Sequence, residues 1–231
     1  MRTLNILVVA IVCAVGINEL KAQELKTKLD SAAYVIGSQF GEYYFLNQIE
    51  INVDAIYAGM KDGYTGSKVK IQDPEKTDVM RAFEEYIQQK QQESAERESR
   101  FNKEVAKSIL EQNRKDKKIK ETASGLQYQV ITEGKGKKPI AADRVKVHYV
   151  GTLYDGTVFD SSRSRNQPAV FGLTQVIPGW TEALQLMTEG STYKFWIPSE
   201  LGYGDRPPQG SNIKAGSLLI FEVELIEINP E

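Results

Sequence analysis

Aromatic side chains are the residues of this chain whose types and spacing suggest a site. In the C-terminal half they surround one short segment, V-I-P-G-W-T-E-A-L, that begins at Val176. These aromatic residues are Tyr149, Phe159, Phe171, Trp180, Tyr203 and Phe221. Rings gathered beside one segment fill either a protein core or an apolar pocket, and their spacing in the sequence does not separate the two. In the second case, their chemistry would be the binding of an apolar group.

Nucleophilic and metal-bound chemistry have few candidate residues. The 231 residues contain one cysteine, Cys13, and one histidine, His148. A structural zinc site needs about four such ligands, and a Cys–His catalytic pair would use both single copies. The net charge of −2 gives no general attraction to nucleic acid or to anionic lipid.

Trp180 belongs to a helix that must be short. Pro178 and Gly179 precede it, Leu184 and Met187 follow at helical spacing, and the apolar pattern stops soon afterwards. A helix of this length is held by packing rather than by its own hydrogen bonds. Trp180 is therefore interpreted either as a core side chain or as the floor of a pocket.

Alternating apolar residues predict the strands that must position these rings. The alternation occurs over residues 126–130, 145–153, 193–197 and 219–225, with turn residues between the runs. Strands that accompany a single short helix favour a compact antiparallel sheet wrapped on that helix. The predicted fold class is α+β, with an all-helical N-terminal domain, a long connecting helix and then this sheet.

The N-terminal half is predicted to be helical. An apolar stripe with i, i+3, i+4 spacing runs from Leu29 to Tyr44, and a shorter one covers residues 53–60. Gly37 and Gly41 lie four residues apart on the first stripe and would let another helix approach closely. A segment this small cannot bury its own stripe well, and two intertwined chains could use it.

A long helix is predicted to follow. Asp73 and Pro74 suit the N-cap and the first helical position, and no Gly or Pro occurs again until Gly125. Residues 88–100 are polar on all sides, a pattern typical of a helix that bridges solvent. The alternative is a disordered middle, which the unbroken run of helix formers opposes.

The first residues indicate an export signal. Arg2 precedes the apolar run of residues 6–15, which is too short to span a bilayer comfortably. Ala22 offers a small residue at a cleavage point. Cys13 lies inside the run without the preceding small residue of a lipoprotein signal, so the interpretation is soluble export of a mature chain that has no cysteine.

Motifs of the C-terminal half, taken in order, resemble the FKBP family of peptidyl-prolyl cis-trans isomerases. They are V-H-Y-V-G-T-L-Y-D-G-T-V-F-D-S-S, V-I-P-G-W-T-E-A-L, P-S-E-L-G-Y-G and L-I-F-E-V-E-L. The helical half, with S-A-A-Y-V-I-G-S-Q-F-G, is similar to the dimerisation segment of Mip-type and FkpA-type bacterial members. With a signal peptide over residues 1–22, the resemblance implies a helical dimerisation segment over 23–76, a linker helix over 77–121 and an isomerase domain over 122–231.

The resemblance also implies the residues of a proline-binding pocket. The catalytic residues would be Tyr149, Phe159, Asp160, Tyr203 and Phe221. The substrate-binding residues would be Phe171, Val176, Ile177, Trp180 and Ile213. In the family, the backbone N–H at Ile177 and the hydroxyl at Tyr203 hold carbonyl groups of the ligand, and the ring at Trp180 lies beneath the proline. No metal and no cofactor is implied.

The pocket wall departs from the family pattern in places. Ala169 stands where many single-domain members have phenylalanine, and the segment between Phe171 and Val176 is shorter than in those members. The loop of residues 205–214 differs too and contains no histidine. These departures concern ligand detail rather than the activity.

Two titratable residues near the pocket have simple expected roles. Asp160 is expected to pair with Arg165 and orient the pocket wall, in preference to acting as a general acid or base. His148 alternates away from Tyr149 on its strand and is expected to be an ordinary surface or packing residue.

The predicted function is prolyl isomerisation that assists the folding of exported proteins, together with chaperone activity. Rotation about an X-Pro bond breaks no bond, so a pocket that favours the twisted amide suffices. The predicted partners are proline-containing unfolded or partly folded chains and a second copy of this chain, with no nucleic acid and no membrane span in the mature protein. The predicted location is the periplasm, either free or associated with the outer membrane. The alternative is a holdase-type chaperone whose proline-binding pocket is incidental.

Overall fold

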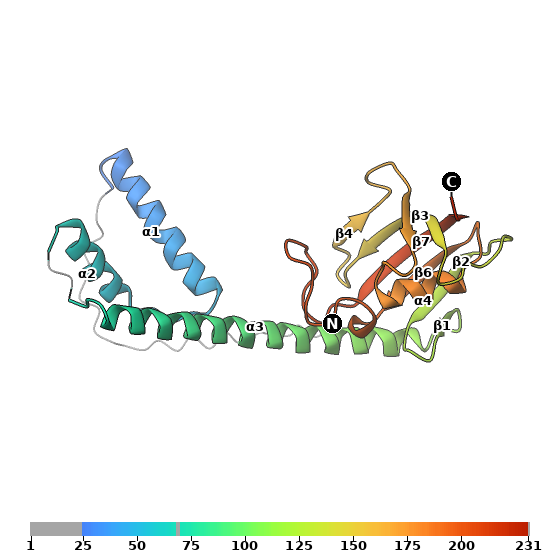
Figure 1. Cartoon of the computed structure of the whole chain (residues 1–231), viewed down its shortest axis with the longest axis horizontal. Coiled ribbons are helices and arrows are strands. Elements are labelled where there is room, and N and C mark those ends of the chain that lie inside the picture. The colour runs from blue at the N-terminus through green and yellow to red at the C-terminus, as the bar shows by residue number, and fades with distance from the viewer. Residues whose placement is uncertain (1–24, 68–69, 231) are drawn as a thin grey trace, which may run out of the picture. The chain divides into compact units, whose positions relative to one another are not determined.

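A computed structural model describes residues 25–67 and 70–230 of the chain (Figure 1). The predicted signal peptide lies outside the described residues. The chain divides into two compact units, and the division in the sequence falls after residue 68. Within the described ranges, no helix is both long and apolar enough to cross a membrane.

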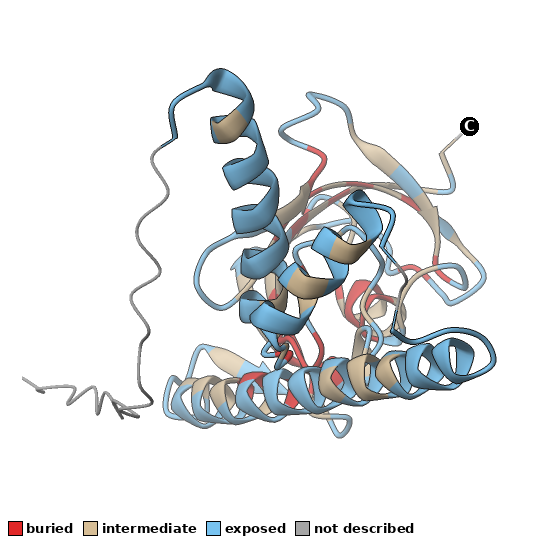
Figure 2. Ribbon diagram, turned by 90° about the vertical axis from the view of Figure 1, so that its left-hand side faces the viewer, coloured by how far each residue is buried: buried red, intermediate tan, exposed pale blue. Residues whose placement is uncertain are grey.

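The first unit contains α1 (Lys28–Leu46) and α2 (Val53–Tyr64), and local hydrogen bonds set where each helix begins. Thr27 and Asp30 form a capping box, in which each side chain accepts a hydrogen bond from the backbone N–H of the other, at 3.0 and 2.8 Å. Neither helix has a buried residue, and Figure 2 shows both mainly in the colour of exposed residues. The predicted apolar stripes are therefore uncovered within one chain.

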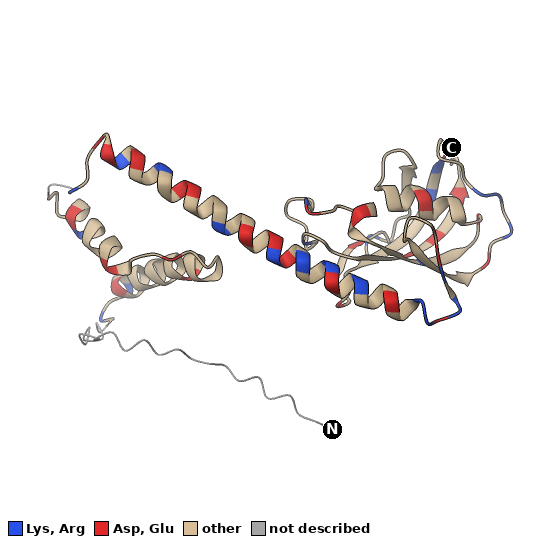
Figure 3. Cartoon of the chain, turned by 90° about the horizontal axis from the view of Figure 1, so that it is seen from below, with Lys and Arg blue, Asp and Glu red and all other residues tan. Residues whose placement is uncertain are grey.

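The second unit begins with α3 (Glu75–Asn113), which is continuous through the polar residues 88–100, as predicted. Its exposed surface carries acidic and basic side chains along its length (Figure 3). Pro74 occupies the N-cap position that was predicted for Asp73. The helix ends at Asn113, within the linker segment predicted over residues 77–121. Beyond it, Asp116 accepts a hydrogen bond from the backbone N–H of Lys118 at 2.9 Å and starts a turn.

A seven-stranded antiparallel sheet follows, with the strand order β1-β2-β6-β7-β3-β4. The strands are β1 (Ile119–Glu121), β2 (Gln127–Thr132), β3 (Arg144–Thr152), β4 (Val158–Ser161), β5 (Ala169–Gly172), β6 (Thr192–Ile197) and β7 (Leu219–Ile228). One edge of β3 is shared, since its first half pairs with β5 and its second half with β4. The predicted strands are present, and β1, β4 and β5 were not anticipated because their short runs carry little alternation.

The main core lies between this sheet and α4 (Pro178–Leu186). Val145, Val147 and Tyr149 of β3 alternate inward and are buried, as the predicted pattern requires. Leu184 of α4 is 1% exposed and Met187, just after the helix, is fully buried. Figure 2 shows the buried residues gathered between sheet and helix, which confirms the predicted α+β arrangement.

The C-terminal part of α3 covers a second apolar surface of the same unit (Figure 1). Trp196 breaks the inward alternation of β6, yet it is only 7% exposed because it packs with Ala106 of α3 and with Leu218. Gln127 donates a hydrogen bond to the backbone oxygen of Leu110 at 2.9 Å and ties the end of the helix to β2. This part of α3 is therefore integral to the folded domain.

We expect Leu184→Ala to lower the free energy of unfolding by about 2–5 kcal/mol, because it leaves a cavity between α4 and the sheet. The matched control is Ile131→Ala on β2, where the side chain is 50% exposed and the change should be within about 0.5 kcal/mol. Urea denaturation of both variants measures the difference. Equal losses would contradict the placement of α4 over the core.

Candidate functional site

A cavity of about 580 Å³ opens on the inner side of the sheet beside α4. Every residue of the predicted pocket lines it: Tyr149, Phe159, Asp160, Phe171, Val176, Ile177, Trp180, Tyr203, Ile213 and Phe221. The fold thus brings together residues that are up to about seventy positions apart in the sequence, from four strands, one helix and two loops.

The rings of the cavity meet edge to face. Trp180 contacts Tyr149, Phe171 and Phe221 with ring centroids 5.2, 5.3 and 5.1 Å apart and interplanar angles of 89°, 83° and 81°. Phe159 meets Phe221 in the same way, at 5.4 Å and 90°. Such pairs contribute about 0.5–1.5 kcal/mol each beyond the area they bury. The cavity wall is therefore held by the packing of its own rings.

Gly151 of β3 makes room for two of these rings. A Cβ atom at this position would lie 2.7 Å from the ring of Phe159 and 2.8 Å from that of Phe221. Any larger residue would push the rings out of their contact. The glycine is required by the close approach of the rings, which only the folded structure reveals.

Trp180 fulfils both interpretations of its position. It is 4% exposed and belongs to the main core, and it also lines the cavity. One part of the indole packs on the protein interior, while another forms the surface of the hollow. The core and the pocket share this residue.

Asp160 is fixed by two hydrogen bonds. It accepts one from the hydroxyl of Tyr149 at 2.5 Å and one from Arg165 at 2.6 Å, which confirms the predicted pairing with Arg165. Arg165 also donates to the Tyr149 oxygen at 2.9 Å. Partial burial alone would raise the pKa of Asp160, but the hydrogen bonds from Arg165 and Tyr149 outweigh it and lower that pKa. Burial first, and then the hydrogen bond to Asp160, raise the pKa of Tyr149 to about 12.

Several hydrogen-bond donors of the cavity residues have no acceptor among the residues that the structure describes. They include the hydroxyl of Tyr203, the backbone N–H of Ile177, the residue before α4, and the buried indole N–H of Trp180. Burial, and then the negative charge of Asp160, raise the pKa of Tyr203, so its hydroxyl keeps its proton at neutral pH. The first two donors border a mostly apolar hollow, whose other polar lining residues are Asp160, Gln175 and Ser211.

Some lining residues were missed by sequence reasoning. Gln175, Pro208 and Ser211 also line the cavity. They lie in the two segments whose length or composition departs from the family pattern, and that departure was the available signal. Ala169, which was expected to widen a wall, does not line the cavity but lies in β5 opposite Val147.

His148 takes no part in the cavity. Its Nδ1 lies 3.1 Å from the hydroxyl of Ser162, which also accepts a hydrogen bond from the backbone N–H of Tyr149 at 2.8 Å. The prediction of a packing role for His148 agrees with this geometry. The residue supports the strand from which Tyr149 projects.

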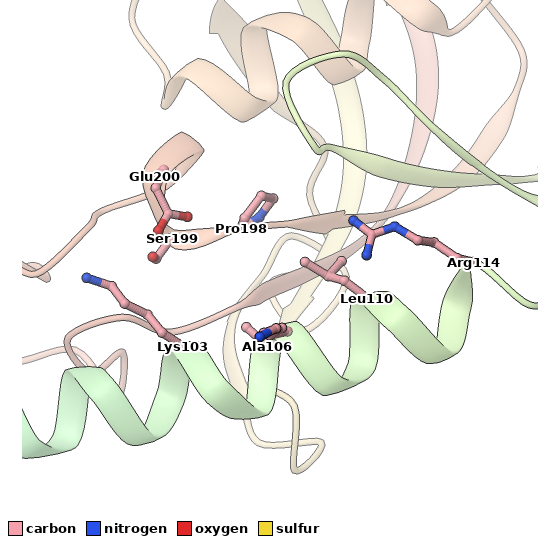
Figure 4. Close-up of a pocket in the computed structure, with 8 residues that line it drawn as sticks. Lys103, Ala106, Leu110, Arg114, Pro198, Ser199 and Glu200 are labelled. Atoms are coloured by element: carbon pink, nitrogen blue, oxygen red, sulfur yellow. The ribbon is translucent and has the colours of Figure 1, made fainter.

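A smaller cavity of about 210 Å³ lies between α3 and the segment Pro198–Glu200 (Figure 4). Lys103 and Arg114 stand at its two ends, and Leu110 faces Pro198 between them. None of the residues that line it is aromatic. It does not share the geometry of the larger, ring-lined cavity.

Comparison with known proteins agrees with this geometry. The family model described as FKBP-type peptidyl-prolyl cis-trans isomerase matches residues 135–226, and the model of the domain amino-terminal to it matches residues 29–130. The outer membrane protein MIP of Legionella longbeachae is 39% identical over 90% of this chain and 88% of its own length.

The chain belongs to the FKBP-type peptidyl-prolyl cis-trans isomerases. The FKBP-type 22 kDa isomerase of Escherichia coli is 43% identical over 85% of this chain and 94% of its own. The crystal structure of FkpA from Escherichia coli superposes with a TM-score of 0.74 at 35% identity, covering 90% of this chain and 99% of that one. These FKBP-type relatives confirm both the family and the fold class that the motifs predict.

We expect Asp160→Asn to lower the free energy of unfolding by about 1 kcal/mol at pH 7, a small value because the site is partly exposed and screened by solvent. The pKa of Asp160 lies below its usual 3.8 in the folded state, so the carboxylate stabilises the fold above that value. The contribution is lost as the pH falls through the lowered pKa. Urea denaturation at pH 7 and pH 3 should show the difference between variant and wild type shrinking. A difference that stays constant would contradict the assigned pairing.

Proposed function

We propose that the ring-lined cavity binds the prolyl residue of unfolded or partly folded polypeptides and catalyses isomerisation of the peptide bond before it. The observation that carries this proposal is a ring-lined cavity of about 580 Å³, bordered by the hydroxyl of Tyr203 and the backbone N–H of Ile177, neither of which has an acceptor among the described residues. A pyrrolidine ring fits on Trp180, and the donors suit the carbonyl groups that flank a proline.

The rate enhancement follows from the polarity of the amide. Resonance gives the planar X-Pro bond a rotation barrier of about 18–20 kcal/mol and separates charge between oxygen and nitrogen. Twisting the bond removes the resonance and, with it, this charge separation. A dry apolar environment therefore disfavours the planar form more than the twisted one. Every ~1.4 kcal/mol of such preference gives a tenfold faster reaction. No covalent intermediate is needed.

The polar residues have separate roles in this proposal. The N–H of Ile177 and the hydroxyl of Tyr203 orient the substrate through its carbonyl groups. Asp160 and Arg165 hold the Tyr149 ring against Trp180. Asp160 is thus a positioning group, since both of its oxygens are already engaged.

We further infer that two copies of the chain associate through the first unit. Leu29, Ile36 and Phe40 of α1 are 79%, 67% and 46% exposed, although they belong to the apolar stripe. Burying such side chains stabilises by about 1.5–3 kcal/mol each. A second copy supplies the same stripe, and tethering two pockets raises the effective concentration of a chain that touches both.

Export to the periplasm, where the protein assists folding, is also proposed. The apolar run that precedes Ala22 supports it, as does the name of the Legionella relative, an outer membrane protein. X-Pro isomerisation is slow enough to limit folding, and this catalyst works without ATP. Apolar side chains of α2, outside the stripe of α1, are also suited to bind unfolded chains: Tyr57 and Met60 are 68% and 67% exposed, which is the basis for the proposed chaperone activity.

We expect Tyr203→Phe to lower kcat/KM for a proline-containing tetrapeptide about three- to tenfold, because one hydrogen bond to the substrate is lost. Tyr203→Ala should lower it further, since the ring is removed as well. The control is Tyr154→Phe, which lies outside the cavity and should leave the rate unchanged. Suppression of aggregation of a denatured protein should survive in all three variants. Joint loss of both activities in a folded Tyr203 variant would refute the division of labour.

We expect Ile36→Asp to convert a dimer into monomers at micromolar concentration, because it places a charge within the apolar stripe of α1. Val158→Asp on β4, whose side chain is 52% exposed, is the control and should remain dimeric. Sedimentation equilibrium distinguishes the two states. A wild-type monomer, or an Ile36→Asp dimer, would contradict the proposed association.

A further inference from the structure

We propose that Ser99, Asn102 and Lys103 of α3 are positioning residues for the prolyl cavity. They fasten both ends of one loop that supplies a wall of that cavity, an inference that rests on the proposed function. The isomerase boundary expected at residue 122 would leave all three outside the catalytic domain.

The loop concerned is residues 204–216, here called the pocket loop. The backbone N–H of Gly216 donates to the oxygen of Gly204 at 2.9 Å and closes its base. Pro208, Ser211 and Ile213 in its middle line the cavity, and Tyr203 directly precedes it. The position of the loop therefore decides where one wall of the cavity stands.

The first end of the pocket loop is held at Asp205. The hydroxyl of Ser99 donates to this carboxylate at 2.5 Å, and the Lys103 ammonium lies 2.8 Å from it. Ser99 is only 6% exposed, so its hydroxyl is held within the contact. The ion pair itself is exposed and is worth little alone, but it acts with the buried hydroxyl on the same carboxylate.

The second end is held at Ala215 and Gly216. The side-chain amide of Asn102, which is 7% exposed, donates to the oxygen of Ala215 at 2.8 Å. Gly216 has φ +71°, and a Cβ there would lie 2.5 Å from the backbone oxygen of Ser99. The backbones of helix and loop thus touch at a position that only glycine can occupy.

The contacts between helix and loop lie at the two ends of the loop. A groove of about 590 Å³ beside these contacts is lined on the loop side by Asp205, Arg206 and Ala215. The middle of the loop, with Pro208, Ser211 and Ile213, lines the prolyl cavity instead. Fixing the ends of a loop restricts the conformations of what lies between them, which reduces the entropy that substrate binding must remove.

The test uses the full chain and the isosteric variant Asn102→Asp, which removes the donor to Ala215 and changes no volume. Arg114→Ala is the matched control, because it breaks the hydrogen bonds to Glu121 at 2.7 and 2.8 Å at the far end of the same helix. The measurements are the rate of amide hydrogen exchange at Gly216, and kcat and KM for a proline-containing tetrapeptide.

For Asn102→Asp we expect about tenfold faster exchange at Gly216, the effect of one lost buried hydrogen bond. KM should rise about three- to tenfold while kcat stays within about twofold, since a looser wall weakens binding of ground and transition state alike. Arg114→Ala should leave the exchange rate at Gly216, KM and kcat at their wild-type values.

The proposal is overturned if exchange at Gly216 accelerates while KM does not change, or if Arg114→Ala raises KM equally. Should Asn102→Asp fail to fold, Ser99→Ala, which removes only a hydroxyl, provides the same test with the same expected direction. A wild-type chain without isomerase activity would refute the proposed function instead. In that case, unchanged exchange at Gly216 in both Asn102→Asp and Ser99→Ala would independently refute the proposal that α3 fixes the ends of the pocket loop.

Discussion

The edge-to-face packing of Tyr149, Phe171 and Phe221 around Trp180 is the interaction on which the C-terminal unit depends. These rings close the core on one side and form the cavity surface on the other. A site of this kind cannot loosen without unpacking the core, because the same atoms serve both. The contacts that keep the apolar hollow open are thus the same contacts that stabilise the core.

The polar groups around the rings follow from this constraint. The Tyr149 hydroxyl lies at the border of an apolar region and needs a partner there, and Asp160 supplies it. Arg165 in turn neutralises the carboxylate. Tyr149, Asp160 and Arg165 are hydrogen-bonded to one another. Tyr203 and the N–H of Ile177 lie outside this network and are the donors that we propose for the substrate.

The long helix has two roles that its sequence does not distinguish. Its polar middle is continuous helix in solvent, whereas the turns around Asn102 and Ala106 are part of the isomerase domain. Small residues, Ser99 and Ala106, allow the helix to lie close to the loop and to Trp196. The compact unit that contains the cavity therefore includes the end of the helix, and we propose that this helix also positions a wall of the cavity.

Much of this protein could be predicted from its sequence alone. Alternation over residues 145–153 and 219–225 determined the central strands, because one face of each strand must be apolar to meet the core. The ordered motifs determined the family, and through it the residues of the cavity. Arg165 was predicted as the partner of Asp160 because it is the nearest candidate in the sequence, and the structure shows this pair.

Only the tertiary structure decided the remainder, because it depends on contacts between distant segments. The alternation of β6 predicts Trp196 on the outer face, and its burial results from a helix about ninety residues earlier in the chain. Gly151 and Gly216 have no local signature, since the atoms that exclude a side chain there belong to Phe159, Phe221 and Ser99. Periodicity reports which way a side chain points from its own element, whereas what it meets is set by how the elements assemble.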